Sequence, residues 1–475
     1  MSGRAAIVGG GVIGGGWAAR FLLAGWDVSV FDPAPDAQRK LHEVIANARR
    51  SLPGLYDVAL PAEGQLRFAS SIAEAVTDAI WIQESAPERL ETKHAIFRDV
   101  QASCPTEAIV ASSTSGFKPS DLHTSAQQPT QIIVAHPFNP VYLIPLVELV
   151  GAAETVRRAQ TILDQLGMKP LHIKREIDAH VADRLLEAVW REALWLINDG
   201  IATTAEIDDA IRFGFGLRWA QMGLFETYRI AGGEAGMEHF IRQFGPALQW
   251  PWSKLTDVPD LNDNLISTIA SQSDAQSGNR SIRELERLRD DNLVAVMRAL
   301  KGRGQAVGKL LNTLDERWRP APAATMTASR TVPIDWTDYN GHMNESRYGQ
   351  VFSDAADRIL ERIGAGPDYV AGGFSFFTVD THIKFKRETH AGDHIVVHTL
   401  LREASGKKLR LFHDMQDARS GETLATGEQL LIHVDLTARR ACEPSTTVRD
   451  RMTALASEHR TLSGAHASVS QPTNH

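Results

Sequence analysis

A histidine and a carboxylate in the first half of the chain have types and spacing suited to proton transfer. His136 ends an apolar run and precedes a rigid Pro-Phe-Asn-Pro bend, and Glu148 follows twelve residues later. A histidine can take the proton of a substrate alcohol as hydride leaves, and a carboxylate can fix its tautomer and stabilise the imidazolium. The alternative is a buried structural histidine, which is common in globular proteins.

A glycine-rich turn near the start of the chain could bind a dinucleotide. Gly9, Gly11 and Gly14 have the spacing G-x-G-x-x-G between an apolar run and a helical pattern, and Asp32 ends the next β-rich run. Such a turn brings backbone N–H groups to a pyrophosphate, and a carboxylate in this place binds ribose hydroxyls and repels a 2′-phosphate. The pattern therefore predicts NAD rather than NADP. The predicted turn residues are Gly9, Gly10, Gly11, Val12, Ile13 and Gly14. The alternative is a tight turn with no ligand.

A second group of polar residues lies far along the chain. Asp338, Asn340 and His342 have D-x-N-x-H spacing just before a long helical pattern. Backbone N–H donors at a helix start suit a carbonyl that becomes an oxyanion. Asp338 could act on water as a general base, or attack as a nucleophile, while the other two side chains orient the reaction. An Asx-rich helix cap would explain the same residues without catalysis.

The first group needs a sheet to position it. Strand candidates at 79–82, 108–111, 131–135 and 146–150 alternate with helical stretches. This alternation predicts an α/β fold with a Rossmann-type doubly wound sheet over 1–177. Ligands bind at the carboxyl ends of the strands in such sheets, so Ser115 and His136 are expected at the edge where the cofactor lies.

Two further domains are predicted after the sheet. Residues 178–312 have long helical patterns and suggest an all-helical substrate and dimerisation domain, followed by a proline-alanine linker at 313–327. Residues 328–445 combine a long helix at 345–363 with strand-like runs, which predicts an α+β domain whose sheet wraps around one helix. The last part, 446–475, is polar and is expected to be disordered.

Composition restricts the class of protein. A charge of −8 gives no basic surface for nucleic acid or anionic lipid. The two cysteines, Cys104 and Cys442, make neither a disulfide framework nor a C-x-x-C metal site. The apolar runs are too short to span a bilayer, and no signal peptide precedes the first strand. We therefore expect a cytoplasmic protein without nucleic-acid or membrane partners.

The first 310 residues resemble the 3-hydroxyacyl-CoA dehydrogenase superfamily. The resemblance rests on T-S-G at 114–116, H-P-F-N-P at 136–140 and Glu148. It implies that His136 is the base, that Glu148 orients it and that Ser115 binds the substrate hydroxyl. It also places three residues on the nicotinamide side: Glu88, Lys93 and Asn139. Asp183 stands where the family usually has Asn, and an ionised Asp accepts hydrogen bonds but cannot donate them.

The helical region points to a cationic substrate. The segment 37–65 lacks the lysine-rich stretch that acyl-CoA members use near the CoA phosphates. The helical region instead contains half of the ten tryptophans: Trp190, Trp195, Trp219, Trp250 and Trp252. Aromatic faces and ionised Asp attract a quaternary ammonium group, although core packing is the alternative for any single Trp. With the runs at 216–233 and 246–255, the pattern resembles the L-carnitine dehydrogenase branch. The gulonate dehydrogenase and lambda-crystallin group, or a 3-hydroxyacyl-CoA dehydrogenase, is the alternative.

Residues 328–440 resemble hotdog-fold thioesterases through the segment 332–360. Carnitine dehydrogenases joined to betainyl-CoA thioesterases have this arrangement. It implies oxidation of L-carnitine, hydrolysis of betainyl-CoA and a homodimer, because hotdog units pair their sheets. A scaffold that only binds NAD and CoA esters is the non-enzyme alternative. We expect no metal site, since no suitably spaced ligand pair occurs among His342, His382, His390 and His394.

Overall fold

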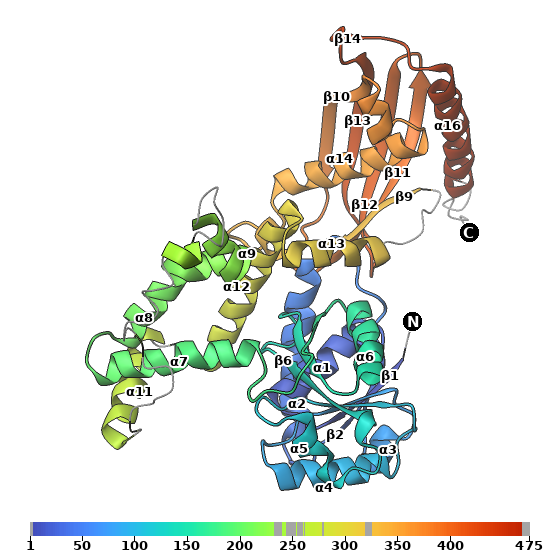
Figure 1. Ribbon diagram of the computed structural model, residues 1–475. Coiled ribbons are helices and arrows are strands. Elements are labelled where there is room, and N and C mark those ends of the chain that lie inside the picture. The colour runs from blue at the N-terminus through green and yellow to red at the C-terminus, as the bar shows by residue number, and fades with distance from the viewer. Residues whose placement is uncertain are drawn as a thin grey trace. The chain divides into compact units, whose positions relative to one another are not determined.

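A computed structural model describes residues 3–231, 240–243, 253, 260, 262–277, 280–318 and 325–467. The chain forms two compact units (Figure 1). The first unit consists of Met1–Leu52 and Pro61–Leu314, and the second of Pro53–Leu60 and Asp315–His475. Each unit is described by itself.

The first unit is built on an eight-stranded sheet in the order β3-β2-β1-β4-β5-β6-β7-β8. All neighbouring strands are parallel except β6 and β7, which are antiparallel. Its strands are β1 (Arg4–Val8), β2 (Asp27–Phe31), β3 (Leu66–Phe68), β4 (Trp81–Glu84), β5 (Ile109–Ser112), β6 (Ile132–Pro137), β7 (Leu146–Val150) and β8 (Lys169–His172). The connecting helices are α1 (Val12–Leu23), α2 (Ala37–Ser51), α3 (Ile72–Val76), α4 (Leu90–Gln101), α5 (Pro119–Leu122) and α6 (Ala153–Gln165). The predicted doubly wound sheet is confirmed.

Strand β1 marks the point where the strand order reverses. It pairs with β2 on one side and with β4 on the other, so the connections leave the sheet in opposite directions. This reversal opens a crevice at the carboxyl ends of the two strands, where doubly wound sheets bind ligands. The strands are buried apolar runs, as parallel strands covered on both faces must be: Ala6, Ile82, Val110 and Val134 are fully buried.

Helices make up the rest of the first unit. They are α7 (Ala182–Asn198), α8 (Thr204–Ala210), α9 (Gly216–Ala231), α11 (Asp263–Ser277), α12 (Ile282–Arg303) and α13 (Val307–Trp318), whose last residues, from Asp315, belong to the second unit. Helix α8 begins with a capping box: the Glu206 N–H donates to the Thr203 hydroxyl oxygen, and the Glu206 side chain accepts from the Thr203 backbone N–H. The predicted boundary at 312 falls inside α13, and within the predicted linker 313–327 the residues 319–324 lie outside the described ones.

The second unit is a single sheet around a central helix, α14 (Glu345–Arg362). The sheet order is β10-β13-β12-β11-β9, and every pairing is antiparallel. The remaining elements are β9 (Met326–Thr331), α15 (Pro367–Ala371), β10 (Phe374–Phe385), β11 (His394–Ser405), β12 (Lys408–Asp417), β13 (Thr423–Asp435) and β14 (Arg440–Ala441). Val351, Phe352 and Ala355 of α14 pack on apolar residues of the sheet, which confirms the predicted hotdog architecture.

The expectation of disorder over 446–475 is wrong for its first part. Thr446–Ala467 form a helix, α16, which packs against β11 in Figure 1. Val448, Met452 and Leu455 are buried against sheet residues that include Leu401. Large apolar residues recur at helical spacing within this segment, although its composition is rich in alanine and serine. These residues cover an apolar face of the sheet.

A short segment from early in the chain belongs to the second unit. Asp57 accepts hydrogen bonds from the guanidinium of Arg330 at 2.8 Å, and its backbone N–H donates to Asp315 at 3.0 Å. The ring of Tyr56 lies 4.9 Å from that of Trp318. The segment Pro53–Leu60 is therefore fixed by residues more than two hundred positions away.

Candidate active sites and related proteins

The glycine turn joins β1 to α1. Gly9 has a φ of +98°, which only glycine adopts without strain. A Cβ at Gly14 would lie 1.8 Å from the carbonyl oxygen of Gly9, so the helix can approach the turn only with glycine there. Among the described residues, no atom lies within 4 Å of the position that a Cβ of Gly11 would take. This open space lies beside Val12 and Ile13 at the start of α1, where free N–H groups favour a phosphate.

Asp32 follows the end of β2 and borders this turn. Its Oδ2 accepts a hydrogen bond from the Gly10 N–H at 2.6 Å, and its Oδ1 accepts one from the Ala34 N–H at 2.8 Å. Each carboxylate oxygen keeps a second lone pair. The carboxylate is thus held in place by backbone donors and can still accept hydrogen bonds from ribose hydroxyls. The open turn and this fixed acid fit an adenosine diphosphate group.

Lys93 and Glu88 form part of an ion-pair network at the carboxyl end of β4, together with Glu84. The Lys93 side chain is 1% exposed, and its Nζ donates to both Glu84 carboxylate oxygens at 2.9 and 3.1 Å. Its Nζ also lies 3.2 Å from Glu88 Oε2. The buried ammonium is therefore matched by two carboxylates, and its position fixes Glu88.

Glu88 in turn holds the loop that carries Ser115. It accepts hydrogen bonds from the Thr114 hydroxyl and from the Gly116 N–H. Burial raises the pKa of Glu88, but these hydrogen bonds and Lys93 outweigh it and hold the pKa below its usual value. Ser115 is exposed between the two tethered residues, and Asn139 is exposed beyond the end of β6. Both side chains can be reached from solvent.

His136 and Glu148 are direct neighbours across β6 and β7. Their register in the antiparallel pair places them opposite each other, with His136 Nδ1 3.1 Å from Glu148 Oε2. A carboxylate only accepts, so Nδ1 carries the hydrogen and Nε2 keeps its lone pair. Glu148 is fully buried, and its Oε1 accepts from the backbone N–H groups of Val181 and Ala182, both at 2.8 Å.

These contacts determine the ionisation of Glu148. Burial raises its pKa, but the hydrogen bonds from His136 and from the first turn of α7 outweigh burial and leave the pKa below its usual value. The carboxylate is therefore charged at neutral pH. The predicted pair is brought together with the geometry that a general base requires.

A second histidine, His180, lies beside this pair and was not found from the sequence. Its ring centroid is 5.5 Å from that of His136, and its Nε2 lies 3.3 Å from the Thr114 carbonyl oxygen. Burial, and then the His136 imidazole, lower its pKa, so it is neutral at pH 7. Ala179 and His180 both have positive φ, and this bend aims the next two N–H groups at Glu148. Asp183, half-buried in the first turn of α7, opposes the lowering of the His180 pKa.

The predicted tryptophans have different surroundings. Trp190 on α7 is 53% exposed, and Trp195 is half-buried on the same helix. Trp219 on α9 is 38% exposed, with its ring 4.5 Å from that of Phe215. Trp250 and Trp252 lie outside the described residues. Trp190 and Trp219 thus have aromatic surface available to a ligand.

The second predicted site is a tight turn before α14. Asp338 Oδ1 accepts from the backbone N–H groups of Asn340 at 2.8 Å and His342 at 3.3 Å. Asn344 then caps the helix by accepting from the Ser346 N–H at 3.0 Å. The Asn340 side chain is exposed at the tip of the turn. Asp338 and His342 thus lie close together through the turn.

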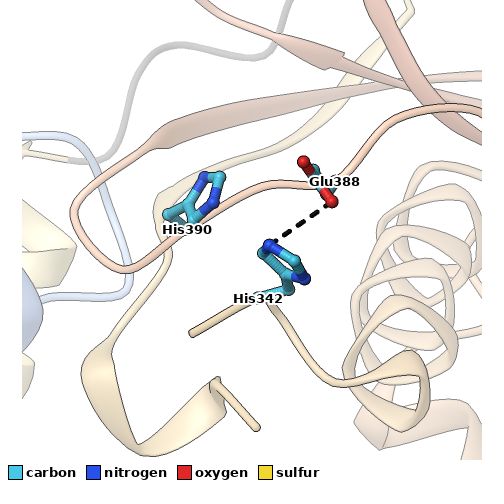
Figure 2. A group of neighbouring side chains, drawn as sticks. All are labelled: His342, Glu388 and His390. Atoms are coloured by element: carbon cyan, nitrogen blue, oxygen red, sulfur yellow. Dashed lines mark ion pairs between the residues drawn. The ribbon is translucent and has the colours of Figure 1, made fainter. Parts of the chain in front are cut away.

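Asp338 and His342 line a cavity of about 480 Å³ in the second unit. The side chains that share it include Tyr348 of α14, Phe385 at the end of β10, Arg387 and Glu388. Glu388 Oε2 lies 3.3 Å from His342 Nε2 (Figure 2). Asn340 is absent from the lining. Sequence spacing did not indicate Tyr348 or Glu388, because Glu388 comes from a loop more than forty residues after His342.

Family comparisons divide the chain as its fold does. Residues 4–177 match "3-hydroxyacyl-CoA dehydrogenase, NAD binding domain", and residues 180–260 match the C-terminal domain of the same family. Residues 332–452 match the "Thioesterase-like superfamily". The first unit therefore contains an NAD-binding domain of the dehydrogenase type.

Individual relatives cover almost the whole chain. A protein of Ruegeria pomeroyi named "L-carnitine dehydrogenase/betainyl-CoA thioesterase" is 56% identical, over 98% of this chain and 99% of its own length. A protein of Agrobacterium fabrum with the same name is 56% identical, over 92% and 91%. "L-carnitine dehydrogenase" of Mesorhizobium japonicum is 58% identical over 65% of this chain and 87% of its own length.

A solved structure supports the fold of the first unit. The protein in the crystal structure of 5-formyl-3-hydroxy-2-methylpyridine 4-carboxylic acid 5-dehydrogenase, an NAD⁺-dependent dismutase, is 29% identical, with a TM-score of 0.55 over 64% of this chain and 99% of that one. Among the described residues, no helix has the length and apolar character needed to cross a bilayer. The fold, the two sites and the near-complete match to relatives agree, and the chain belongs to the family of L-carnitine dehydrogenase/betainyl-CoA thioesterases.

Proposed function

We propose that this chain is a bifunctional enzyme of carnitine degradation. Its first unit oxidises L-carnitine to 3-dehydrocarnitine with NAD, and its second unit hydrolyses betainyl-CoA to glycine betaine and CoA. The observation that carries the proposal is the His136–Glu148 pair at the cofactor edge of an NAD-binding domain. The substrate names come from relatives that are 56% identical over nearly the whole chain.

In the oxidation, bound NAD accepts the hydride from the carbon that carries the substrate hydroxyl. His136 Nε2 takes the hydroxyl proton, and the buried Glu148 carboxylate stabilises the imidazolium that forms. Ser115 orients the hydroxyl from the loop that Glu88 tethers. Lys93 acts through Glu88, since its ammonium is buried away from solvent.

The cationic end of L-carnitine requires aromatic faces and negative charge rather than hydrogen-bond donors. Trp190 and Trp219 offer exposed rings, and Asp183 offers a carboxylate whose charge acts on His180. We assign the trimethylammonium group to this side of the site. A neutral His180 adds no positive charge that would repel it.

In the hydrolysis, either water adds to the thioester carbonyl as Asp338 takes its proton, or Asp338 adds and water then hydrolyses the resulting mixed anhydride. In both cases the C–S bond breaks, the CoA sulfur takes up a proton, and the acyl group leaves as glycine betaine. Asp338 is the base or the nucleophile, and its carboxylate is oriented by the turn backbone. His342 lies in the same cavity, with Glu388 at 3.3 Å as its positioning residue. Asn340 shapes the turn through its backbone.

The two activities are tested together in the full chain, with each variant serving as the control for the other. His136→Gln should lower carnitine-dependent NAD reduction by about 10²–10⁴-fold, the scale of a general base, and leave hydrolysis of betainyl-CoA unchanged. Asp338→Asn should lower hydrolysis by at least about 10²-fold and leave NAD reduction unchanged. Reduction of NADP should be slow, because Asp32 repels a 2′-phosphate.

Other outcomes would identify other functions. Good turnover of 3-hydroxybutyryl-CoA without turnover of L-carnitine would favour an acyl-CoA dehydrogenase. NAD binding in calorimetry with no turnover would favour a scaffold. Betainyl-CoA hydrolysis at the wild-type rate by D338N would reduce the second unit to a CoA-ester binding module.

A further inference from the structure

Two loops of the second unit bring three potential metal ligands together. His342, in the turn before α14, pairs in an antiparallel bridge with His390, in the loop before β11, and Glu388 lies two residues before His390 (Figure 2). The ligand atoms of the three side chains all lie within 4.8 Å of one another. We call this group the His-Glu-His cluster.

The backbone fixes the two histidines as neighbours. The Met343 N–H donates to the Thr389 carbonyl oxygen at 2.7 Å, next to the bridged pair. Residues directly opposite in an antiparallel pair have Cβ atoms about 4.5–5.5 Å apart, and the two imidazole centroids are 4.9 Å apart. Two imidazoles at this separation can bind one ion from the same side of the bridge.

The spacing within the cluster suits a metal better than a hydrogen bond. Glu388 Oε2 and His342 Nε2 are 3.3 Å apart, whereas charge-assisted hydrogen bonds span about 2.7–2.9 Å. Two ligands at about 2.0–2.2 Å from a tetrahedral zinc ion lie roughly 3.3–3.6 Å from each other. The observed separation falls in that range.

The surroundings of His390 resemble those of metal-binding histidines, in which a carboxylate lies near the ring nitrogen that does not bind the metal. Asp393 Oδ2 accepts the His390 backbone N–H at 2.7 Å and the Thr389 hydroxyl at 3.1 Å, and it lies 3.6 Å from His390 Nδ1. A carboxylate behind one ring nitrogen orients the other nitrogen toward a metal. The Glu388 and His390 side chains are 64% and 53% exposed, so an ion can enter from solvent.

We propose that the His-Glu-His cluster binds one divalent transition-metal ion of the zinc type. Two histidines and one carboxylate leave a coordination position open, as in metal sites that exchange water or ligand. Because His342 and Glu388 also line the cavity of Asp338, the bound ion occupies the mouth of that cavity and inhibits thioester hydrolysis. This proposal departs from the expectation drawn from sequence spacing, which gave no metal site because His342 is far from His390 in the chain.

Binding is tested on the untagged full chain, stripped with EDTA and titrated with zinc chloride in a calorimeter. We expect one ion per chain at this site, and at least tenfold weaker binding in Glu388→Gln and His390→Gln. His382→Gln is the matched control, because His382 is an exposed histidine on β10 outside the cluster, and it should bind as the wild type does. Cobalt(II) should give a visible spectrum in the wild type that H390Q lacks.

The same variants connect the ion to the cavity. Zinc should inhibit betainyl-CoA hydrolysis by the wild type and by H382Q, and at least tenfold more zinc should be needed for H390Q. Hydrogen exchange of the second unit, measured in parallel without zinc, reports whether that unit is folded in each variant. Equal zinc affinity in the wild type, E388Q and H390Q would overturn the proposal, and because binding is measured without a CoA ester, that result is independent of whether the second unit hydrolyses one.

Discussion

Glu148 has two tasks that no neutral side chain can perform together. One oxygen accepts from His136 Nδ1, and the other accepts from two backbone N–H groups at the start of α7. The same carboxylate therefore sets the tautomer of His136 and holds the start of α7, which carries Asp183 and directly follows the bend at His180. The orientation of the base and the position of the helical region are linked through one side chain.

Glu148→Gln tests this double task. A glutamine has one acceptor oxygen, so its NH₂ must face either His136 Nδ1–H or the two α7 N–H groups. Leaving such buried donors unpaired costs about 1–3 kcal/mol. We expect a loss of roughly 10²-fold or more in kcat/KM for L-carnitine, with NAD affinity unchanged, measured by steady-state kinetics and calorimetry. Near-wild-type kinetics in E148Q would show that the charge and its second hydrogen bond are dispensable.

Residues within one short segment were predictable, and residues joined by the fold were not. The glycine turn and the His136–Glu148 pair follow from local spacing, because neighbouring strands of one sheet fix them. His180 was missed because its role depends on two residues with positive φ that turn it toward His136. Glu388 was missed because a bridge between distant loops brings it to His342.

At the scale of elements, strands β11, β12 and β13 each contribute one side chain to a hydrogen-bonded polar group inside the apolar core. His413 is fully buried, with Nδ1 2.8 Å from the Thr399 hydroxyl and Nε2 3.1 Å from Gln429 Oε1. Its ring stacks on Phe352 of α14 at 5.1 Å. Both ring nitrogens are satisfied in the neutral form, with Nε2–H donating to Gln429 Oε1 and Nδ1 accepting from the Thr399 hydroxyl.

Burial lowers the pKa of His413 to about 4, from 6.5 in the unfolded chain. As the pH falls from 6.5 to 4, the unfolded state binds a proton that the folded state refuses, so the free energy of unfolding decreases. The loss reaches about 3 kcal/mol, at about 1.4 kcal/mol for each pKa unit. Hydrogen exchange of β11–β13 in a pH series should show this loss, and it should be smaller in His413→Gln than in the control H382Q. Equal pH dependence in both variants would assign the loss to other groups.

Helix α16 was expected to be disordered because its average composition is polar and rich in alanine and serine. Val448, Met452, Leu455, Ala456 and His459 recur at helical spacing and are buried, but alanine and serine lie between them. The helix also closes a polar contact, since the Leu401 N–H donates to His459 Nδ1 at 2.9 Å. The expectation of disorder followed the average composition and overlooked this narrow apolar stripe.

Removal of α16 should therefore unfold the second unit. Burial of Val448, Met452 and Leu455 contributes about 1.5–3 kcal/mol for each side chain, against about 5–15 kcal/mol for a typical domain. A chain that ends at Ser445 should lose betainyl-CoA hydrolysis and keep carnitine oxidation. A chain that ends at Ala467 is the control and should keep both activities. Full hydrolysis by the shorter chain would show that the sheet is stable without this cover.

At the scale of the whole molecule, β10 gives the second unit an exposed apolar edge. The strand lies at the end of the sheet order, and Phe377, Val379 and Phe385 are 53%, 58% and 53% exposed. A long apolar edge strand promotes pairing with another strand. We infer that two copies of the chain associate through β10.

Val379→Lys should weaken that association, because a charge on the edge opposes strand pairing. Sedimentation velocity should give a smaller assembly for V379K than for the wild type at the same concentration. Val370→Lys is the control, since Val370 is 43% exposed on α15 and is not part of the edge strand. A wild-type chain that sediments as a monomer at micromolar concentration would exclude the dimer.

The segment Pro53–Leu60 can form its contacts with the second unit only late in synthesis. Asp57 leaves the ribosome 273 residues before its partner Arg330. At about 5–20 residues per second, Asp57 spends roughly 14–55 s without that guanidinium. The first sheet can fold during this interval, but Pro53–Leu60 cannot form its contact with Arg330 until that residue has been synthesised. A chain whose translation stops after β8 but before Arg330 would therefore contain every strand of the first sheet, while Pro53–Leu60 still lacked its partner Arg330.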